Sequence, residues 1–194
     1  PHVTPDELKA MIDAGENMVI VDGRTPAEFE RVSIPGGRSC PNGELALRID
    51  ACAPDPDTTI VVNCAGRTRS IIGAQTLIDL GVPNKVVALE NGTQGWSLAG
   101  LALNHGAKES YPPGLGSDEI DRRRERVLKL AETRGARLAE PSEVSTWLAD
   151  MTRTTYLIDV RTDEEHGESP VAGMLHAPGG QLVQATDQWI GVRG

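Results

Sequence analysis

The chain has 194 residues and a formal net charge of −9, from 19 Lys and Arg against 28 Asp and Glu. This length allows one domain or two small ones, and the acidic balance argues against a nucleic-acid partner because phosphate backbones repel negative charge. No apolar run approaches the ~20 residues that span a bilayer, so we expect no membrane partner. Three cysteines are too few for a disulfide framework, which favours a reducing, cytoplasmic setting.

The first half of the chain alternates helix and strand signals. Thr4-Pro5-Asp6-Glu7 form a capping box, which predicts a helix over residues 5–14 that ends at Gly15. The elements expected after it alternate between buried strands and helices, namely strand 18–21, helix 44–51, strand 59–63, helix 70–80 and strand 85–89. Short apolar strands alternating with helices indicate an α/β fold with a central parallel sheet flanked by helices.

The composition then changes. Residues 104–117 contain two prolines and three glycines, which is typical of a linker. A charged helix is predicted from Ser117 to about Thr133, and it contains the run Arg122-Arg123-Arg124. Because Asp and Glu residues surround this run, we expect a solvated helix face rather than an anion-binding patch.

The sequence also matches itself at an offset of 137 positions. Eight identities fall in an ungapped window of 24 residues, and they pair Asp22, Arg24, Thr25, Glu28, Gly36, Pro41, Gly43 and Leu45 with Asp159, Arg161, Thr162, Glu165, Gly173, Pro178, Gly180 and Leu182. We interpret this match as a duplicated unit. In each copy the Asp and Arg are expected to form an ion pair that braces the end of a strand rather than to contact a substrate.

One segment has the features of a reactive site. The strand ending at Asn63 delivers Cys64 to its carboxyl end, where open α/β sheets place their ligand sites. A short loop with one glycine follows and runs directly into a helix, and the amides of such a loop point inward and bind negative charge. With Arg67 and Arg69 beside it, we expect the Cys64 thiol to ionise more easily than a free cysteine.

The alternative is that Cys64 is an ordinary buried cysteine, but a core cysteine has no use for two neighbouring guanidinium groups. Cys40 and Cys52 have no such setting, and we interpret both as structural. Ser70 is expected to cap the following helix, to donate a hydrogen bond to bound sulfur, or both. The four histidines lack metal-ligand spacing, so the sequence predicts no metal and no cofactor.

The chain resembles the rhodanese family of sulfurtransferases with tandem domains. The resemblance rests on Asp22-Gly23-Arg24 after a strand, Glu28-Phe29, Ile34-Pro35-Gly36-Gly37, the Cys64 loop, and Glu90-Asn91-Gly92 followed by Trp96 and Gly100. It implies a complete catalytic rhodanese-like domain over residues 1–104 and a linker with the charged helix over 105–135. Residues 136–194 would then be the N-terminal half of a second rhodanese-like domain that lacks its active-site loop, so another copy or further rhodanese domains would complete it.

The resemblance also implies a chemistry. Cys64 would take a sulfane sulfur from thiosulfate or a related anion and pass it, as a persulfide, to a thiol or cyanide. The substrate-binding residues would be those of the loop, namely Ala65, Gly66, Arg67, Thr68, Arg69 and Ser70. The two arginines would hold the sulfonate oxygens by charge-assisted hydrogen bonds.

Two other functions are open on the same fold. Relatives that act as cysteine phosphatases or arsenate reductases have a loop one residue longer, and here only four residues separate Cys64 from Arg69. The loop also offers no acid for a leaving alcohol. A non-catalytic binding module is the other alternative, since fold does not imply function, but the chain has kept the cysteine that inactive copies usually lose.

Overall fold

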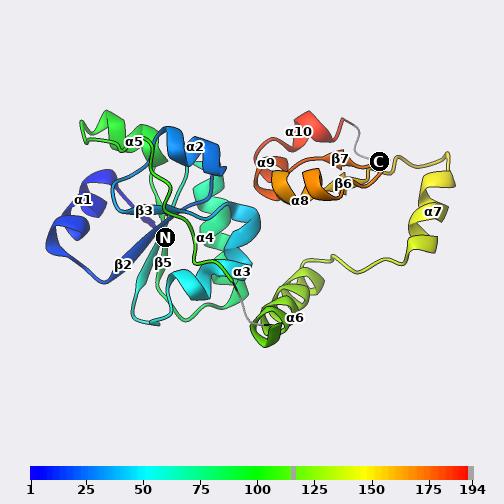
Figure 1. Cartoon of the computed structure of the whole chain (residues 1–194), viewed down its shortest axis with the longest axis horizontal. Helices are drawn as coiled ribbons and strands as arrows, with labels where there is room; N and C mark the ends of the chain where they lie inside the picture. Colours follow the sequence, from blue (N-terminus) through cyan, green and yellow to red (C-terminus); the bar gives the residue numbers. More distant parts are fainter. Residues whose placement is uncertain (115–116, 192–194) are drawn as a thin grey trace. The chain divides into compact units, whose positions relative to one another are not determined.

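A five-stranded parallel sheet forms the centre of the first part of the chain (Figure 1). Its strand order is β1-β5-β4-β2-β3, and the strands are β1 His2–Val3, β2 Met18–Asp22, β3 Gly37–Ser39, β4 Thr59–Asn63 and β5 Val86–Leu89. The computed structural model describes residues 1–114 and 117–191, and the chain divides into two compact units, Pro1–Val127 and Leu128–Gly194.

The two central strands are buried on both faces. In β2, Val19 and Val21 pack into one hydrophobic cluster while Ile20 packs into another. In β4, Ile60 and Val62 share the first cluster and Val61 the second. Side chains alternate between the two faces of a strand, so an unbroken apolar run fits a parallel sheet that is covered on both sides. The predicted α/β architecture is confirmed.

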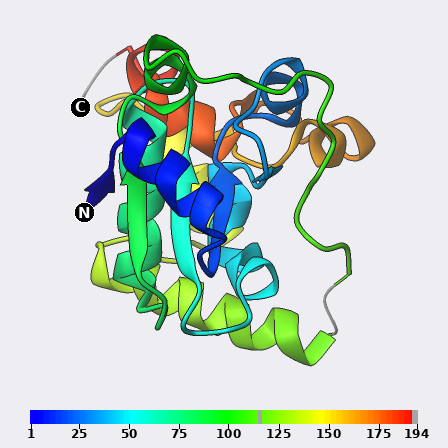
Figure 2. The ribbon, with the colours of Figure 1, turned by 90° about the vertical axis from the view of Figure 1, so that its left-hand side faces the viewer.

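Helices cover the two faces. Those of the first unit are α1 Pro5–Ala14, α2 Pro26–Arg31, α3 Asn42–Cys52, α4 Thr68–Leu80 and α5 Gly92–Leu98. Leu8 of α1 and Trp96 of α5 belong to one cluster, whereas Leu45 of α3 and Leu77 of α4 belong to the other. Figure 2 shows α1 in front of the strands, and Figure 1 shows α3 and α4 on the far side of the sheet from α1.

The local signals at the start of the chain act as predicted. The Thr4 side chain accepts a hydrogen bond from the amide of Glu7, the Glu7 carboxylate accepts one from Thr4, and Gly15 ends the helix in the left-handed conformation. Helix α4 begins two residues earlier than expected, at Thr68. Ser70 therefore lies inside the first turn and does not cap the helix. Its hydroxyl donates to the carbonyl of Arg67 at 2.9 Å.

The charged helix α6 spans Ser117–Thr133 as predicted, but one of its arginines is not solvated. Arg123 is 4% exposed. Its guanidinium donates to the carbonyl of Leu47 in α3 and to the carboxylate of Glu119, and it lies 3.6 Å from Asp50. The expectation of a solvated arginine run is wrong at Arg123, because α6 packs this side chain against α3.

The second unit contains a short parallel pair, β6 Ile158–Asp159 and β7 Leu175–His176. Its helices are α7 Pro141–Ala149, α8 Asp163–Glu168, α9 Gly179–Gln184 and α10 Thr186–Trp189. Local contacts of the first unit recur here. Arg161 pairs with Asp159 at the end of β6 as Arg24 pairs with Asp22 at the end of β2.

Apolar side chains of the second unit remain exposed. Helices α7 to α10 bury no residue, Met151 is 92% exposed and Leu175 is 50% exposed. Exposed aliphatic surface of this kind is typical of an incomplete core or an interaction face. That another chain or domain covers it stays a prediction. Among the described residues, no helix is both long and apolar enough to cross a membrane.

Candidate active site

The loop predicted to be reactive lies at the carboxyl edge of the sheet. Strand β4 ends at Asn63, Cys64 follows at once, and α4 begins at Thr68. The strand on either side of β4 is parallel to it, so the carboxyl ends of three strands meet at this edge. This is the edge at which open α/β sheets bind their ligands.

The carbonyls and the amides of the loop differ in their hydrogen bonding. The carbonyls of Cys64 and Ala65 accept from the amides of Thr93 and Gln94, each at 2.9 Å, at the start of α5. By contrast, among the described residues the amides of positions 65–70 donate to no backbone carbonyl. Six consecutive amides without a backbone acceptor, at a helix N-terminus, form a site for negative charge.

A glycine allows this loop to pack against α5. Gly92 has a φ of +54°, and a Cβ at this position would lie 2.1 Å from the carbonyl oxygen of Cys64. No other residue type fits there without displacing the backbone, because such a distance is far inside van der Waals contact. Gly92 therefore allows the backbone of the Cys64 loop to pack directly against the start of α5.

Arg69 is held by a carboxylate from outside the loop. Its guanidinium donates two hydrogen bonds to Glu28, from Nη1 to Oε2 at 2.7 Å and from Nη2 to Oε1 at 2.8 Å. Burial would raise the pKa of Glu28, but the hydrogen bonds and charge of Arg69 outweigh it and lower that pKa to about 2. Burial lowers the pKa of Arg69, whereas Glu28 and, more weakly, the nearby Cys64 raise it.

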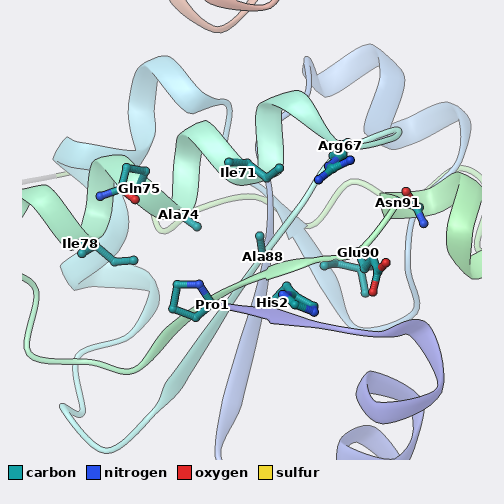
Figure 3. A pocket seen from close by; sticks show the side chains of 11 residues that line it. Pro1, His2, Arg67, Ile71, Ala74, Gln75, Ile78, Ala88, Glu90 and Asn91 are labelled. Carbon is teal, nitrogen blue, oxygen red and sulfur yellow. The ribbon is translucent and has the colours of Figure 1, made fainter.

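The structure separates the two arginines predicted to flank the sulfur. Arg69 is buried and lies within electrostatic range of Cys64. Arg67 is exposed and lines a pocket of about 340 Å³, together with Glu90 and Asn91 at the same end (Figure 3). Cys64 itself is 1% exposed and is not among the residues that line this pocket. The cysteine is thus more enclosed than the sequence indicates, and Arg69 interacts with it electrostatically.

The other residues of the predicted site differ in their exposure to solvent. Ala65 and Gly66 are half-buried, Thr68 is exposed at the start of α4, and Ser70 is buried. Ala65 and Gly66 contribute backbone amides rather than side chains. The Ser70 hydroxyl donates a hydrogen bond to the Arg67 carbonyl, and this bond stabilises the turn that contains these amides.

An ion pair braces the strand ends beneath the loop. Asp22 accepts from Nε and Nη2 of Arg24 at 2.8 and 2.7 Å, and from Nδ2 of Asn63 at 2.7 Å. Asp22 and Arg24 are 1% and 2% exposed. Since Asn63 directly precedes Cys64, the pair ties the end of β2 to the residue that carries the loop. The predicted bracing role of Asp22 and Arg24 is confirmed.

Three residues that contact the loop could not be predicted from the sequence of the loop itself. Glu28 and Gly92 belong to patterns noted elsewhere in the chain, but nothing in those patterns reveals contact with the loop. Asn42, at the start of α3, donates from Nδ2 to the carbonyl of Arg69 at 2.9 Å. An Asn-Gly pair before a helix indicates only a turn, so this contact depends on the packing of α3 against α4.

No metal-binding cluster is found within the described ranges, where no three His, Cys, Asp or Glu side chains come together. Two histidines meet in the second unit. The rings of His166 and His176 stack at 4.1 Å, and Asp159 lies 2.9 Å from Nδ1 of His166. The rings meet because β7 brings His176 beside His166 of α8.

Comparison with known proteins agrees with this architecture. The family model of the rhodanese-like domain matches residues 4–99. A crystal structure of thiosulfate sulfurtransferase from Pseudomonas aeruginosa is 44% identical with a TM-score of 0.92, over 97% of this chain and 36% of that one. A sulfurtransferase from Allochromatium vinosum is 26% identical over 53% of this chain and 92% of its own length.

A third relative has a different function. An HTH-type transcriptional regulator from Mycobacterium tuberculosis is 33% identical over 54% of this chain. The chain spans 45% of the length of this regulator. Together with the sheet order, the loop after β4 and the match over residues 4–99, these likenesses define the domain. Through this domain, the chain belongs to the rhodanese family.

Proposed function

We propose that the chain is a sulfurtransferase that moves a sulfane sulfur from thiosulfate, or a similar small anion, to a thiol or cyanide through a persulfide on Cys64. The observation that carries this proposal is the run of amides at positions 65–70, directly after the cysteine, which donate to no backbone carbonyl in the part of the chain that the structure describes. The similarity to the thiosulfate sulfurtransferase of Pseudomonas aeruginosa and to the sulfurtransferase of Allochromatium vinosum supports the same reaction class.

The first half of the reaction forms the persulfide. The Cys64 thiolate attacks the outer sulfur of thiosulfate, and the S–S bond of the donor breaks so that its electron pair leaves on sulfite. The terminal sulfur that remains on Cys64 is an anion. The amides at positions 65–70 stabilise it by hydrogen bonds, and Arg69 adds positive charge nearby. Sulfite is a good leaving group, so this step needs no general acid.

The second half regenerates the enzyme. A nucleophilic acceptor, either a thiolate or cyanide, attacks the terminal sulfur, and the electron pair of the S–S bond returns to Cys64. Arg67 is exposed at the edge of the loop and lies beside the pocket with Glu90 and Asn91. In this proposal the exposed Arg67 binds the anionic donor first, while the ion pair with Glu28 keeps Arg69 in place.

A direct assay separates this proposal from its alternatives. The protein is incubated with thiosulfate and cyanide, and thiocyanate is measured. A parallel sample receives an aryl phosphate. Thiocyanate production that is lost in Cys64→Ser and retained in Cys40→Ser is the expected result. Phosphate release without thiocyanate would favour a cysteine phosphatase, and no turnover in either assay would favour a binding module.

A further inference from the structure

An apolar groove extends from the reactive loop along helix α4. It is the pocket of about 340 Å³ beside Arg67, and its α4 wall consists of Ile71, Ala74 and Ile78. These residues recur at intervals of three and four, so they share one face of the helix. Ala88 and Leu89 of β5 form the opposite wall. Figure 3 shows the three α4 side chains in a row that faces Ala88.

Two side chains of this α4 groove are exposed although they are apolar. Ile71 is 46% exposed and Ile78 is 39% exposed, whereas Ala88 and Leu89 opposite them are buried. Aliphatic side chains that line a concave surface are removed from water when an apolar group binds there, which stabilises the complex. A volume of about 340 Å³ is that of a site for a small molecule.

The end of the α4 groove next to the reactive loop is polar. Arg67, Glu90 and Asn91 lie at this end, and all three are exposed (Figure 3). In the part of the chain that the structure describes, neither the Arg67 guanidinium nor the Glu90 carboxylate makes a hydrogen bond or an ion pair. An unpaired guanidinium beside an unpaired carboxylate is complementary to a ligand that carries both a carboxylate and an N–H donor.

The donor of the proposed reaction does not account for this groove. Thiosulfate and cyanide have no apolar part, so neither gains from contact with Ile71 or Ile78. The polar end of the groove adjoins the reactive loop, because Asn91 directly precedes Gly92, which packs against the Cys64 carbonyl. Cys64 itself does not line the groove, so a thiol bound there reaches the persulfide by extending from this end over the loop.

We propose that the α4 groove binds the sulfur acceptor, and that this acceptor is an N-acylated aminothiol with a carboxylate and an aliphatic acyl chain. Arg67 binds the carboxylate, Glu90 accepts a hydrogen bond from the amide N–H, and Ile71 and Ile78 contact the chain. The inference rests on the sulfurtransferase activity proposed above.

The transfer step then follows from this placement. The acceptor thiolate attacks the outer sulfur of the Cys64 persulfide, the S–S bond of the persulfide breaks, and its electron pair returns to Cys64. The acceptor leaves as a persulfide. Because sulfite leaves before the acceptor binds, Arg67 binds the two anions in turn.

Equilibrium binding tests the groove without any sulfur transfer. S-methyl-N-hexanoylcysteine, which has no free thiol, is titrated into the full chain while the isoleucine methyl resonances are recorded by NMR. The resonances of Ile71 and Ile78 are expected to shift. The resonance of Ile120, an isoleucine of α6 that is 45% exposed, is expected to stay unchanged. S-methyl-N-acetylcysteine is expected to bind about tenfold more weakly, because it lacks four methylene groups that the open groove partly covers.

Steady-state kinetics with thiosulfate as donor test the same contacts during turnover. The KM of the unaltered chain is expected to be about tenfold lower for N-hexanoylcysteine than for N-acetylcysteine. Ile71→Ser and Ile78→Ser are each expected to reduce this preference to about threefold or less. Ile120→Ser, the matched control on α6, is expected to keep it.

A third acceptor tests the role of Arg67. N-hexanoylcysteamine has the same acyl chain as N-hexanoylcysteine but no carboxylate. The unaltered chain is expected to show a KM about fivefold higher for N-hexanoylcysteamine, because a charge-assisted hydrogen bond is lost. In Arg67→Gln the KM values of the two acceptors are expected to become equal.

Two results would overturn the inference. The first is binding that shifts neither Ile71 nor Ile78, even in a protein that produces thiocyanate from cyanide. The second is an equal KM for N-hexanoylcysteine and N-acetylcysteine in the unaltered chain. Shifts at Ile71 and Ile78 in a protein that produces no thiocyanate would instead contradict the sulfur transfer at Cys64 while confirming the groove as a ligand site, so the two failures are distinguishable.

Discussion

Glu28 holds Arg69 by two hydrogen bonds of 2.7 and 2.8 Å, across 41 residues of sequence. Glu28 also accepts from the amide and hydroxyl of Thr25 at the start of α2. One carboxylate thus caps a helix and positions the guanidinium beside Cys64. Because the pair is largely buried, removing the carboxylate leaves a buried positive charge without compensation.

Replacing this carboxylate is expected to cost both stability and activity. Glu28→Gln is predicted to lower the free energy of unfolding of the first unit by about 2–3 kcal/mol. Thiosulfate-to-cyanide turnover is predicted to fall about tenfold, because Arg69 is no longer held in place. The control is Glu30→Gln, which removes an exposed pair with Lys108 and is expected to change stability by about 0–1 kcal/mol. Equal effects of the two variants would contradict the role given to Glu28.

The same carboxylate predicts a pH dependence. The pKa of Glu28 is lowered to about 2 in the folded chain, against 4.5 when it is free. The pair therefore contributes its full stability above about pH 4.5, and this contribution is lost as the pH falls toward 2. The difference in unfolding free energy between the unaltered protein and Glu28→Gln, measured by urea denaturation, is expected to shrink by about 3 kcal/mol at most over that range. A difference that stays constant from pH 5 to pH 2.5 would contradict this.

Gly92 is predicted to be required for the close packing of the Cys64 loop against α5. Gly92→Ala places a Cβ 2.1 Å from the Cys64 carbonyl oxygen and also strains a backbone with positive φ. The matched control is Gly100→Ala, which has a φ of +75° but no atom within 4 Å of the added Cβ. Both variants are expected to lose about 1–2 kcal/mol from backbone strain. Only Gly92→Ala is expected to lose sulfur-transfer activity as well, and similar activity in the two variants would argue against the close approach.

The braced strand ends allow a comparison inside one molecule. Asp22→Asn is expected to destabilise β2 and β4 by about 3–5 kcal/mol, because Arg24 is 2% exposed and would lose its counter-charge. Asp159→Asn breaks the corresponding pair, in which Arg161 is 34% exposed, and a smaller effect on β6 is expected. Hydrogen exchange of peptides from each strand measures the two effects separately. A larger loss of protection around β6 would contradict the burial argument.

Short-range signals made most of the first unit predictable from sequence. The capping box at Thr4 and Glu7 and the left-handed Gly15 act within one or two turns, so α1 could be predicted from its own residues. The unbroken apolar run of β4 indicated a buried parallel strand, and the thiol at its end indicated the position of the candidate site.

Contacts between distant segments could not be predicted in this way. Nothing around Glu28 distinguishes a helix-capping carboxylate from one that also binds Arg69, because the second role depends on how β2 and β4 pair. Arg123 is buried only because α6 packs on α3, and a charged helix has the same sequence pattern whether or not one of its arginines is covered.

The central claim is that Cys64 carries sulfur, and intact mass spectrometry after thiosulfate treatment tests it most directly. The unaltered protein is predicted to gain one sulfur atom, which cyanide removes, while Cys64→Ser gains none and Cys40→Ser gains it as before. An unchanged mass in the folded, unaltered protein would contradict the account, as would a sulfur adduct that persists when Cys64 is replaced.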